Sequence, residues 1–132
     1  MTAVRGNLIY VIGGMDPEGK VLDTVDVYDV GAAAWSKGPA LPKGPRNGFS
    51  PAACTLDNRV YVSLGDGGLY RLDDVAGAWE RIATTTARLA HRLVAGTGQR
   101  LLLLGGASGA DMLDLIESID VSPAAISRAA RR

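Results

Sequence analysis

Short apolar runs that end in glycine recur along the chain, separated by polar turn segments. The three clearest runs are Leu8–Gly14, Arg59–Asp66 and Arg100–Gly106. Aliphatic and aromatic runs of this length, bounded by glycine, are typical of β-strands and are too short for most helices. Residues that favour tight turns precede each run, at Arg5–Asn7, Asp57-Asn58 and Gly96–Gly98.

Further strands are expected on both sides of these runs, and Trp35 and Trp79 would lie on the last strand of the first and second units. The additional expected strands are Val25–Val30, Ala52–Leu56, Gly68–Leu72 and Leu93–Ala95. The pattern therefore predicts an all-β chain with almost no helix before residue 122.

The runs belong to an internal repeat. Their first glycines, Gly13, Gly65 and Gly105, are 52 and 40 residues apart. An aspartate stands six residues before each tryptophan, and Trp35 and Trp79 are 44 residues apart. A repeat of roughly 40–50 residues with four short strands has the length of a propeller blade.

The ordered set of markers resembles the kelch repeat, in which a diglycine closes a strand and is followed by Tyr-Asp, Trp, Pro and Arg-x-Gly. The first unit carries the whole set, at Gly13, Gly14, Tyr28, Asp29, Trp35, Pro42 and Arg46-Asn47-Gly48. The second unit keeps Gly65, Asp73 and Trp79, but Asp66 and Leu72 replace the second glycine and the tyrosine. The third unit keeps the diglycine, as Gly105 and Gly106, and has no tryptophan after it.

The resemblance implies an open, partial β-propeller of about three four-stranded antiparallel blades. The repeat region covers residues 1–122, with blades at about 1–44, 45–86 and 87–122, and residues 123–132 form a tail that is frayed or a short helix. The first blade is expected to lack most of its first strand, and the third its fourth. The outer faces of both end blades should then expose apolar side chains, which self-association or further blades from a longer chain would cover.

The repeat also predicts the core. We expect five side chains to be largely buried: Tyr10, Trp35, Cys54, Leu102 and Leu103. Trp79 should be less completely buried than Trp35 if its blade faces an incomplete neighbour.

Charge and hydropathy exclude several classes of protein. The 132 residues include 14 Lys+Arg and 14 Asp+Glu, so the formal net charge is zero, which argues against a nucleic-acid binder. No apolar run approaches the ~20 residues of a membrane span, and no signal-peptide pattern opens the chain. We therefore expect a cytoplasmic protein that binds neither nucleic acid nor membrane.

The residues offer little for catalysis or metal binding. One cysteine and one histidine cannot supply the usual four-ligand zinc site, and we expect no metal and no cofactor. Cys54 lies in a small-residue strand without a basic neighbour, so its thiol is expected to be inert. Nothing in the sequence assembles a nucleophile, a base and an orienting group, and we expect no catalytic residues and no enzyme.

Five residues are candidates for ligand binding through the resemblance. In kelch propellers, arginines that open a blade often line the entrance of the central channel, and some members bind acidic peptides there. Arg46 matches that motif by residue, whereas Arg88 matches by spacing alone because its motif lacks the glycine. Asn47, His91 and Arg92 lie beside these arginines. The alternative for either arginine is an internal role, paired with a neighbouring loop or a backbone carbonyl.

The sequence leaves three hypotheses for function. The leading one is a scaffold that binds a protein or an acidic peptide ligand through the blade loops. The second is a truncated part of a kelch-type enzyme, such as a sugar (sialic acid) epimerase, although such an enzyme would draw polar residues from most blades. The third is an inactive fragment.

Overall fold

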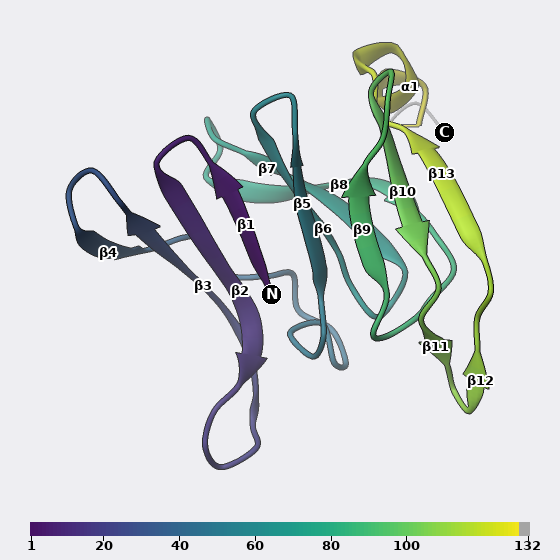
Figure 1. Ribbon diagram of the computed structural model, residues 1–132, viewed down its shortest axis with the longest axis horizontal. Coiled ribbons are helices and arrows are strands. Elements are labelled where there is room, and N and C mark those ends of the chain that lie inside the picture. The colour runs from purple at the N-terminus through teal and green to yellow at the C-terminus, as the bar shows by residue number, and fades with distance from the viewer. Residues whose placement is uncertain (130–132) are drawn as a thin grey trace.

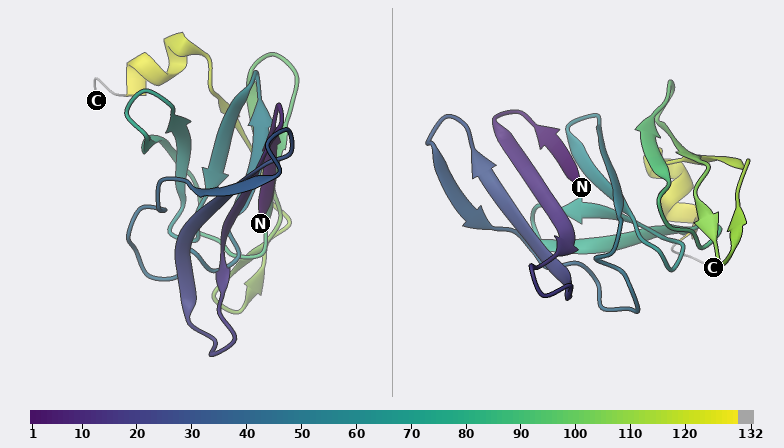
Figure 2. Two further views of the ribbon diagram at one scale, coloured as in Figure 1. Left: turned by 90° about the vertical axis from the view of Figure 1, so that its left-hand side faces the viewer. Right: turned by 60° about the horizontal axis from the view of Figure 1, so that its bottom comes forward.

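The computed structural model describes residues 1–129, and it consists almost wholly of antiparallel β-sheet (Figure 1). Three main sheets follow one another along the chain and stand side by side, as Figure 2 shows from two further directions. Within residues 1–129 these sheets do not close into a ring. The all-β prediction and the open, partial propeller are therefore confirmed.

The first sheet has the strand order β1-β2-β3-β4. Its strands are β1 (Thr2–Arg5), β2 (Leu8–Met15), β3 (Val21–Asp29) and β4 (Ala34–Lys37). Asp29 closes the β3–β4 turn, because its Oδ1 accepts hydrogen bonds from the main-chain N–H groups of Gly31 and Ala32. All four residues of β1 pair with β2, so the expectation that this sheet lacks most of its first strand is corrected.

The second sheet has the order β5-β6-β7-β8 and repeats the first position by position. Its strands are β5 (Ala52–Leu56), β6 (Arg59–Ser63), β7 (Gly68–Asp73) and β8 (Ala78–Thr84). The turn pair Leu56–Arg59 corresponds to Arg5–Leu8, and the pair Leu72–Trp79 corresponds to Tyr28–Trp35. Asp73 accepts hydrogen bonds from the two N–H groups of the β7–β8 turn, as Asp29 does in the first sheet.

The third sheet has three strands in the order β13-β10-β9. They are β9 (Arg92–Ala95), β10 (Arg100–Leu104) and β13 (Ile116–Asp120), and a small hairpin of β11 (Ala107–Ser108) and β12 (Asp111–Met112) lies between β10 and β13.

A short helix, α1 (Pro123–Ala129), follows β13 and accounts for most of the expected tail. Ser122 caps its first turn by accepting a hydrogen bond from the N–H of Ala125, and proline suits the first helical position. Ile126 packs against the apolar cluster between the second and third sheets. The end of the expected tail, residues 130–132, lies outside the described residues.

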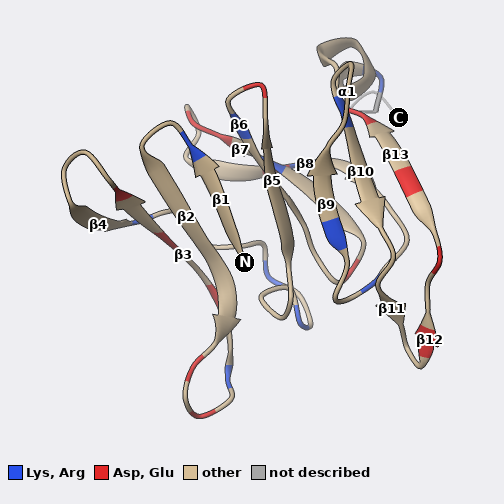
Figure 3. Cartoon of the chain, viewed as in Figure 1, with Lys and Arg blue, Asp and Glu red and all other residues tan. Residues whose placement is uncertain are grey.

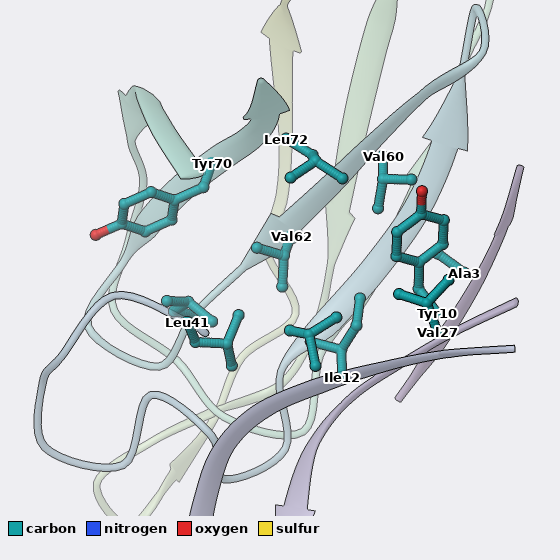
Figure 4. Packing of buried hydrophobic residues seen from close by; sticks show 11 residues of the cluster. Ala3, Tyr10, Ile12, Val27, Leu41, Val60, Val62, Tyr70 and Leu72 are labelled. Carbon is teal, nitrogen blue, oxygen red and sulfur yellow. The ribbon is translucent and has the colours of Figure 1, made fainter. Parts of the chain in front are cut away.

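Two apolar clusters hold the three sheets together. The first lies between the first and second sheets, and Figure 4 shows its side chains from close by: Ala3, Tyr10, Ile12, Val25, Val27, Leu41, Val60, Val62, Leu64, Tyr70 and Leu72. The second lies between the second and third sheets: Ala52, Tyr61, Leu69, Ile82, Leu93, Leu101, Leu103 and Val121. Because successive residues of a strand point to opposite faces, the second sheet contributes to both clusters.

The predicted burial of the tryptophans is wrong, and the reason is the order of the sheets. Trp79 packs against the first cluster, and its Nε1–H donates to the carbonyl oxygen of Pro39 at 2.9 Å. Trp35 holds the same position in the first sheet, but no sheet precedes that sheet within residues 1–129, and Trp35 is 64% exposed.

The other burial predictions are met to different degrees. Tyr10 and Leu103 are buried, as predicted. Cys54 and Leu102 are half-buried.

Candidate functional site

Several connections gather at one edge of the sheets, the lower edge in Figure 1, which we call the lower loop face. It consists of the β2–β3, β6–β7 and β10–β13 connections and the links from β4 to β5 and from β8 to β9, because an antiparallel meander returns to the same edge at every second turn. Main-chain hydrogen bonds join these connections. The N–H of Gly14 donates to the carbonyl of Gly48 at 2.9 Å, and Leu89 and Ala107 exchange two bonds of 2.8 and 2.9 Å.

Two glycines allow the closest approach on this face. Gly13 has a φ of +61°, and a Cβ there would lie 2.6 Å from the carbonyl oxygen of Gly48. A Cβ on Gly48 would in turn collide with the carbonyl oxygen of Leu22. The glycine of the Arg46-Asn47-Gly48 segment is therefore required by contact with the neighbouring backbone.

A cleft of about 200 Å³ lies on the lower loop face. Residues 45–46 of the β4–β5 link, Gly65 after β6, residues 87–89 of the β8–β9 link and residues 107–109 of the β11–β12 hairpin line it. The cleft thus combines segments that are far apart in the sequence and belong to successive repeats. Of the five candidate binding residues, the structure brings Arg46 and Arg88 to this cleft.

Arg46 is exposed at the edge of the cleft. Its backbone has a φ of +64°, and its carbonyl accepts a hydrogen bond from the N–H of Phe49 at 2.8 Å, so a tight turn presents the side chain. Arg46 takes part in none of the ion pairs found within residues 1–129. Its guanidinium is therefore available to a ligand.

Arg88 is in a different environment, with only 2% of its surface exposed. Its Nε donates to the carbonyl of Thr86 at 3.2 Å, its Nη1 donates to the carbonyl of Gly105 at 3.1 Å, and its guanidinium forms an ion pair with Glu117 of β13. Burial lowers the pKa of Arg88 from its ordinary value. These contacts join the β8–β9 link to the third sheet, which is the internal role that the sequence left open for an arginine.

His91 is buried beside this arginine, with 3% of its surface exposed. Its Nε2 lies 2.9 Å from the Oγ of Ser63, and its Nδ1 is buried with no hydrogen-bond partner within residues 1–129. Burial, followed by the positive charge of Arg88, lowers the pKa of His91 to about 4. The imidazole is therefore neutral near neutral pH and offers no positive charge to a ligand.

The two remaining candidates lie outside the lining of the cleft. Asn47 is 1% exposed. Its Nδ2 donates to the carbonyl of Pro42 at 3.1 Å and to Oδ2 of Asp66 at 3.4 Å, so its side chain stabilises the β4–β5 link. Arg92 is exposed at the start of β9. The charged side chains are spread over several elements, with basic positions on the β4–β5 link and on β9 and acidic positions on β3, β12 and β13 (Figure 3).

Sequence reasoning missed two contributions to this region. Glu117, which pairs with Arg88, lies in an ordinary alternating strand pattern, and only the register of β13 against β10 reveals which face it occupies. The wall formed by residues 107–109 comes from the glycine-rich segment after β10. That segment forms the small β11–β12 hairpin before the chain reaches β13.

The half-buried thiol of Cys54 on β5 fits the expectation of an inert residue, because burial raises its pKa to about 12. Within residues 1–129, the seven-residue helix α1 falls well short of the length that a membrane-spanning helix requires.

Residues 2–42, which span the first sheet and the start of the β4–β5 link, match the family model described as the Kelch motif. A search of curated proteins finds no match for the chain.

Proposed function

We propose that this chain, whose residues 2–42 match the Kelch motif, is a scaffold that binds an acidic segment of another protein. Kelch repeats generally serve as protein-interaction scaffolds. The observation that carries the proposal is the exposed Arg46 at a cleft built from connections of successive repeats.

The chemistry of the cleft favours a carboxylate. A guanidinium presents paired N–H donors whose geometry matches the two oxygens of a carboxylate. The donors of Arg88 are already engaged by two carbonyls and by Glu117, so Arg46 is the lining arginine that remains for a ligand. Exposed Lys43 on the same link adds a second positive charge near the lower loop face.

The size of the cleft favours a peptide over a free small molecule. Pockets for drug-sized ligands typically have volumes of about 300–1,000 Å³, whereas this cleft has about 200 Å³. A volume of that size accommodates one or two side chains of a peptide that lies across the lower loop face.

The test is a binding measurement with a labelled Asp/Glu-rich peptide, followed by fluorescence anisotropy. Arg46→Ala should weaken binding about tenfold, because a charged hydrogen-bonding partner contributes on the order of 1.5–3 kcal/mol and part of that is lost to solvent screening. Arg46→Lys should restore binding only in part, since a lysine cannot form the bidentate contact.

Two controls make the measurement specific. Arg59→Ala removes the same charge from an exposed residue at the start of β6, on the edge opposite the lower loop face, and should leave the affinity within about twofold. A peptide with Asn and Gln in place of Asp and Glu should bind weakly. Equal affinities for the two peptides, or equal losses in Arg46→Ala and Arg59→Ala, would refute the proposal.

A further inference from the structure

The first sheet has an apolar face that points away from the second sheet, and we call it the Trp35 face. Cross-strand pairing places Val4, Ile9, Tyr28 and Trp35 in one row across all four strands. Val4 is 56% exposed and Trp35 is 64% exposed. The rings of Tyr28 and Trp35 lie against each other with centroids 5.0 Å apart, so the row presents a continuous aromatic and aliphatic surface.

A hollow adjoins this row. Its volume is about 470 Å³, and Val11, Asp26, Trp35, Ser36 and Lys37 line it. Asp26 and Lys37 form an ion pair of 2.5 Å across β3 and β4. The Trp35 face is therefore a large apolar surface that carries one ion pair, on β3 and β4.

The second sheet shows what this face does when it has a neighbour. Thr55, Val60, Leu72 and Trp79 occupy the positions that correspond to the apolar row of the first sheet. Val60 is 0% exposed and Leu72 is 6% exposed, because both pack against the first sheet. The Oγ1 of Thr55 also donates to a carbonyl of β1, and the indole of Trp79 donates to the carbonyl that follows β4 by two residues.

The third sheet carries the complementary face at the other end of the molecule. Val94 pairs with Leu102, and Leu104 pairs with Ile116, on the side that points away from the second sheet. Ile116 is 65% exposed, and the other three are half-buried. The corresponding residues of the first sheet are Ala3, Tyr10, Ile12 and Val25. These four side chains pack against the second sheet.

We propose that the Trp35 face binds the outward face of the third sheet in a second copy of this chain. The structure of the molecule itself indicates this partner. Each of its two internal interfaces joins a face like the Trp35 face to a face like the outward face of the third sheet, and the molecule exposes one face of each kind at its two ends. The contact is head-to-tail, so it closes a ring when the rotation between copies fits and otherwise extends. None of these residues lines the cleft at Arg46, so the association is separate from ligand binding.

Trp35 should dominate the interaction. Tryptophans in the centre of an interface are the residues whose truncation most often weakens binding strongly. The Asp26–Lys37 pair lies on β3 and β4, and both side chains keep partial access to solvent, which limits the cost of burying the pair. Trp35→Ala and Val4→Arg should each raise the dissociation constant about tenfold or more.

Sedimentation velocity over a hundredfold range of concentration tests the association. The unmodified chain should shift from monomer towards dimer or larger species as the concentration rises, and both face variants should keep the monomer over most of the range. Val75→Arg is the matched control, because Val75 is 99% exposed on the β7–β8 turn and belongs to neither face. A monomer at all concentrations, or association that persists in Trp35→Ala and Val4→Arg, overturns the proposal.

Cysteine cross-linking tests the orientation of the two copies. In a Cys54→Ala background, Val4→Cys marks the Trp35 face and Val94→Cys marks the outward face of the third sheet. These positions are chosen because Thr55, which holds the position of Val4 in the second sheet, contacts β1, the first strand of the preceding sheet. A mixture of the two singly marked chains should form the mixed disulfide under mild oxidation. Cross-linking of Val4→Cys only with itself indicates a face-to-face dimer and contradicts the proposal.

Discussion

The buried histidine makes a quantitative prediction about the pH dependence of stability. His91 is the single histidine of the chain, and burial together with the charge of Arg88 lowers its pKa from 6.5 to about 4 in the folded state. In the unfolded chain its pKa returns to the ordinary value. Between these two pH values the unfolded state binds a proton that the folded state rejects, so the free energy of unfolding must fall as the pH falls.

The size of this effect follows from the two pKa values. They differ by about 2.5, and each unit corresponds to about 1.4 kcal/mol, so complete protonation costs the fold about 3 kcal/mol. The stability is fully present above about pH 6.5, is lost progressively on acidification, and reaches its full loss below about pH 4. A loss of this size is a substantial part of the 5–15 kcal/mol that typically stabilises a domain of about this length.

Urea unfolding at a series of pH values, compared with the His91→Gln variant, measures the effect. Glutamine keeps a hydrogen-bonding partner for Ser63 but does not titrate, so its stability should lack the fall that begins near pH 6.5. A titration of the imidazole followed by NMR gives the folded-state pKa directly and does not depend on the variant. Identical pH dependence in the two proteins, or an imidazole pKa near 6.5, would show that the reasoning is wrong.

Other predictions concern inter-sheet contacts and the free thiol. Trp79→Phe, which loses the hydrogen bond to a main-chain carbonyl, should lower the free energy of unfolding by about 1 kcal/mol, whereas Trp35→Phe at the exposed equivalent position should change it by less than about 0.5 kcal/mol. Glu117→Gln leaves the charge of Arg88 buried without its partner and should cost about 3 kcal/mol in urea unfolding; a neutral result would mean that water reaches the guanidinium. Cys54, with its pKa raised to about 12, should react with a thiol reagent at mildly alkaline pH far more slowly in the folded chain than in the unfolded one, and equal rates would contradict its burial.

Local patterns predicted the strands well because their causes are local. The expected strand at Ala52–Leu56 matches β5 at both ends. The aspartates that precede each tryptophan close the turns after β3 and β7. Turn chemistry and alternation act over a few residues, so a single sequence contains them. The full extent of the first strand is not predicted, because four residues before a turn carry almost no periodic signal.

Burial and site roles depend on neighbours that the sequence does not name. Trp35 and Trp79 have the same spacing from their turns, yet one is exposed and the other packs against the first cluster, because only Trp79 has a preceding sheet to contact. Arg46 and Arg88 likewise occupy similar places in the repeat. The surroundings of Arg88 are set by Glu117, which is 29 residues further along the chain, and this long-range partner makes it a buried structural residue.

The two-sided packing of the middle sheet has a consequence for how the chain opens. The strands of each sheet pair with one another by hydrogen bonds, and the apolar clusters join only adjacent sheets. Loss of either end sheet therefore breaks one cluster and leaves the other in place, as in a linear array with nearest-neighbour coupling. Amide protons of β6 and β7 should be the slowest to exchange with deuterium, since they are released only when both clusters are lost, while those of β1 and β4 should exchange through partial openings that leave the rest of the molecule folded.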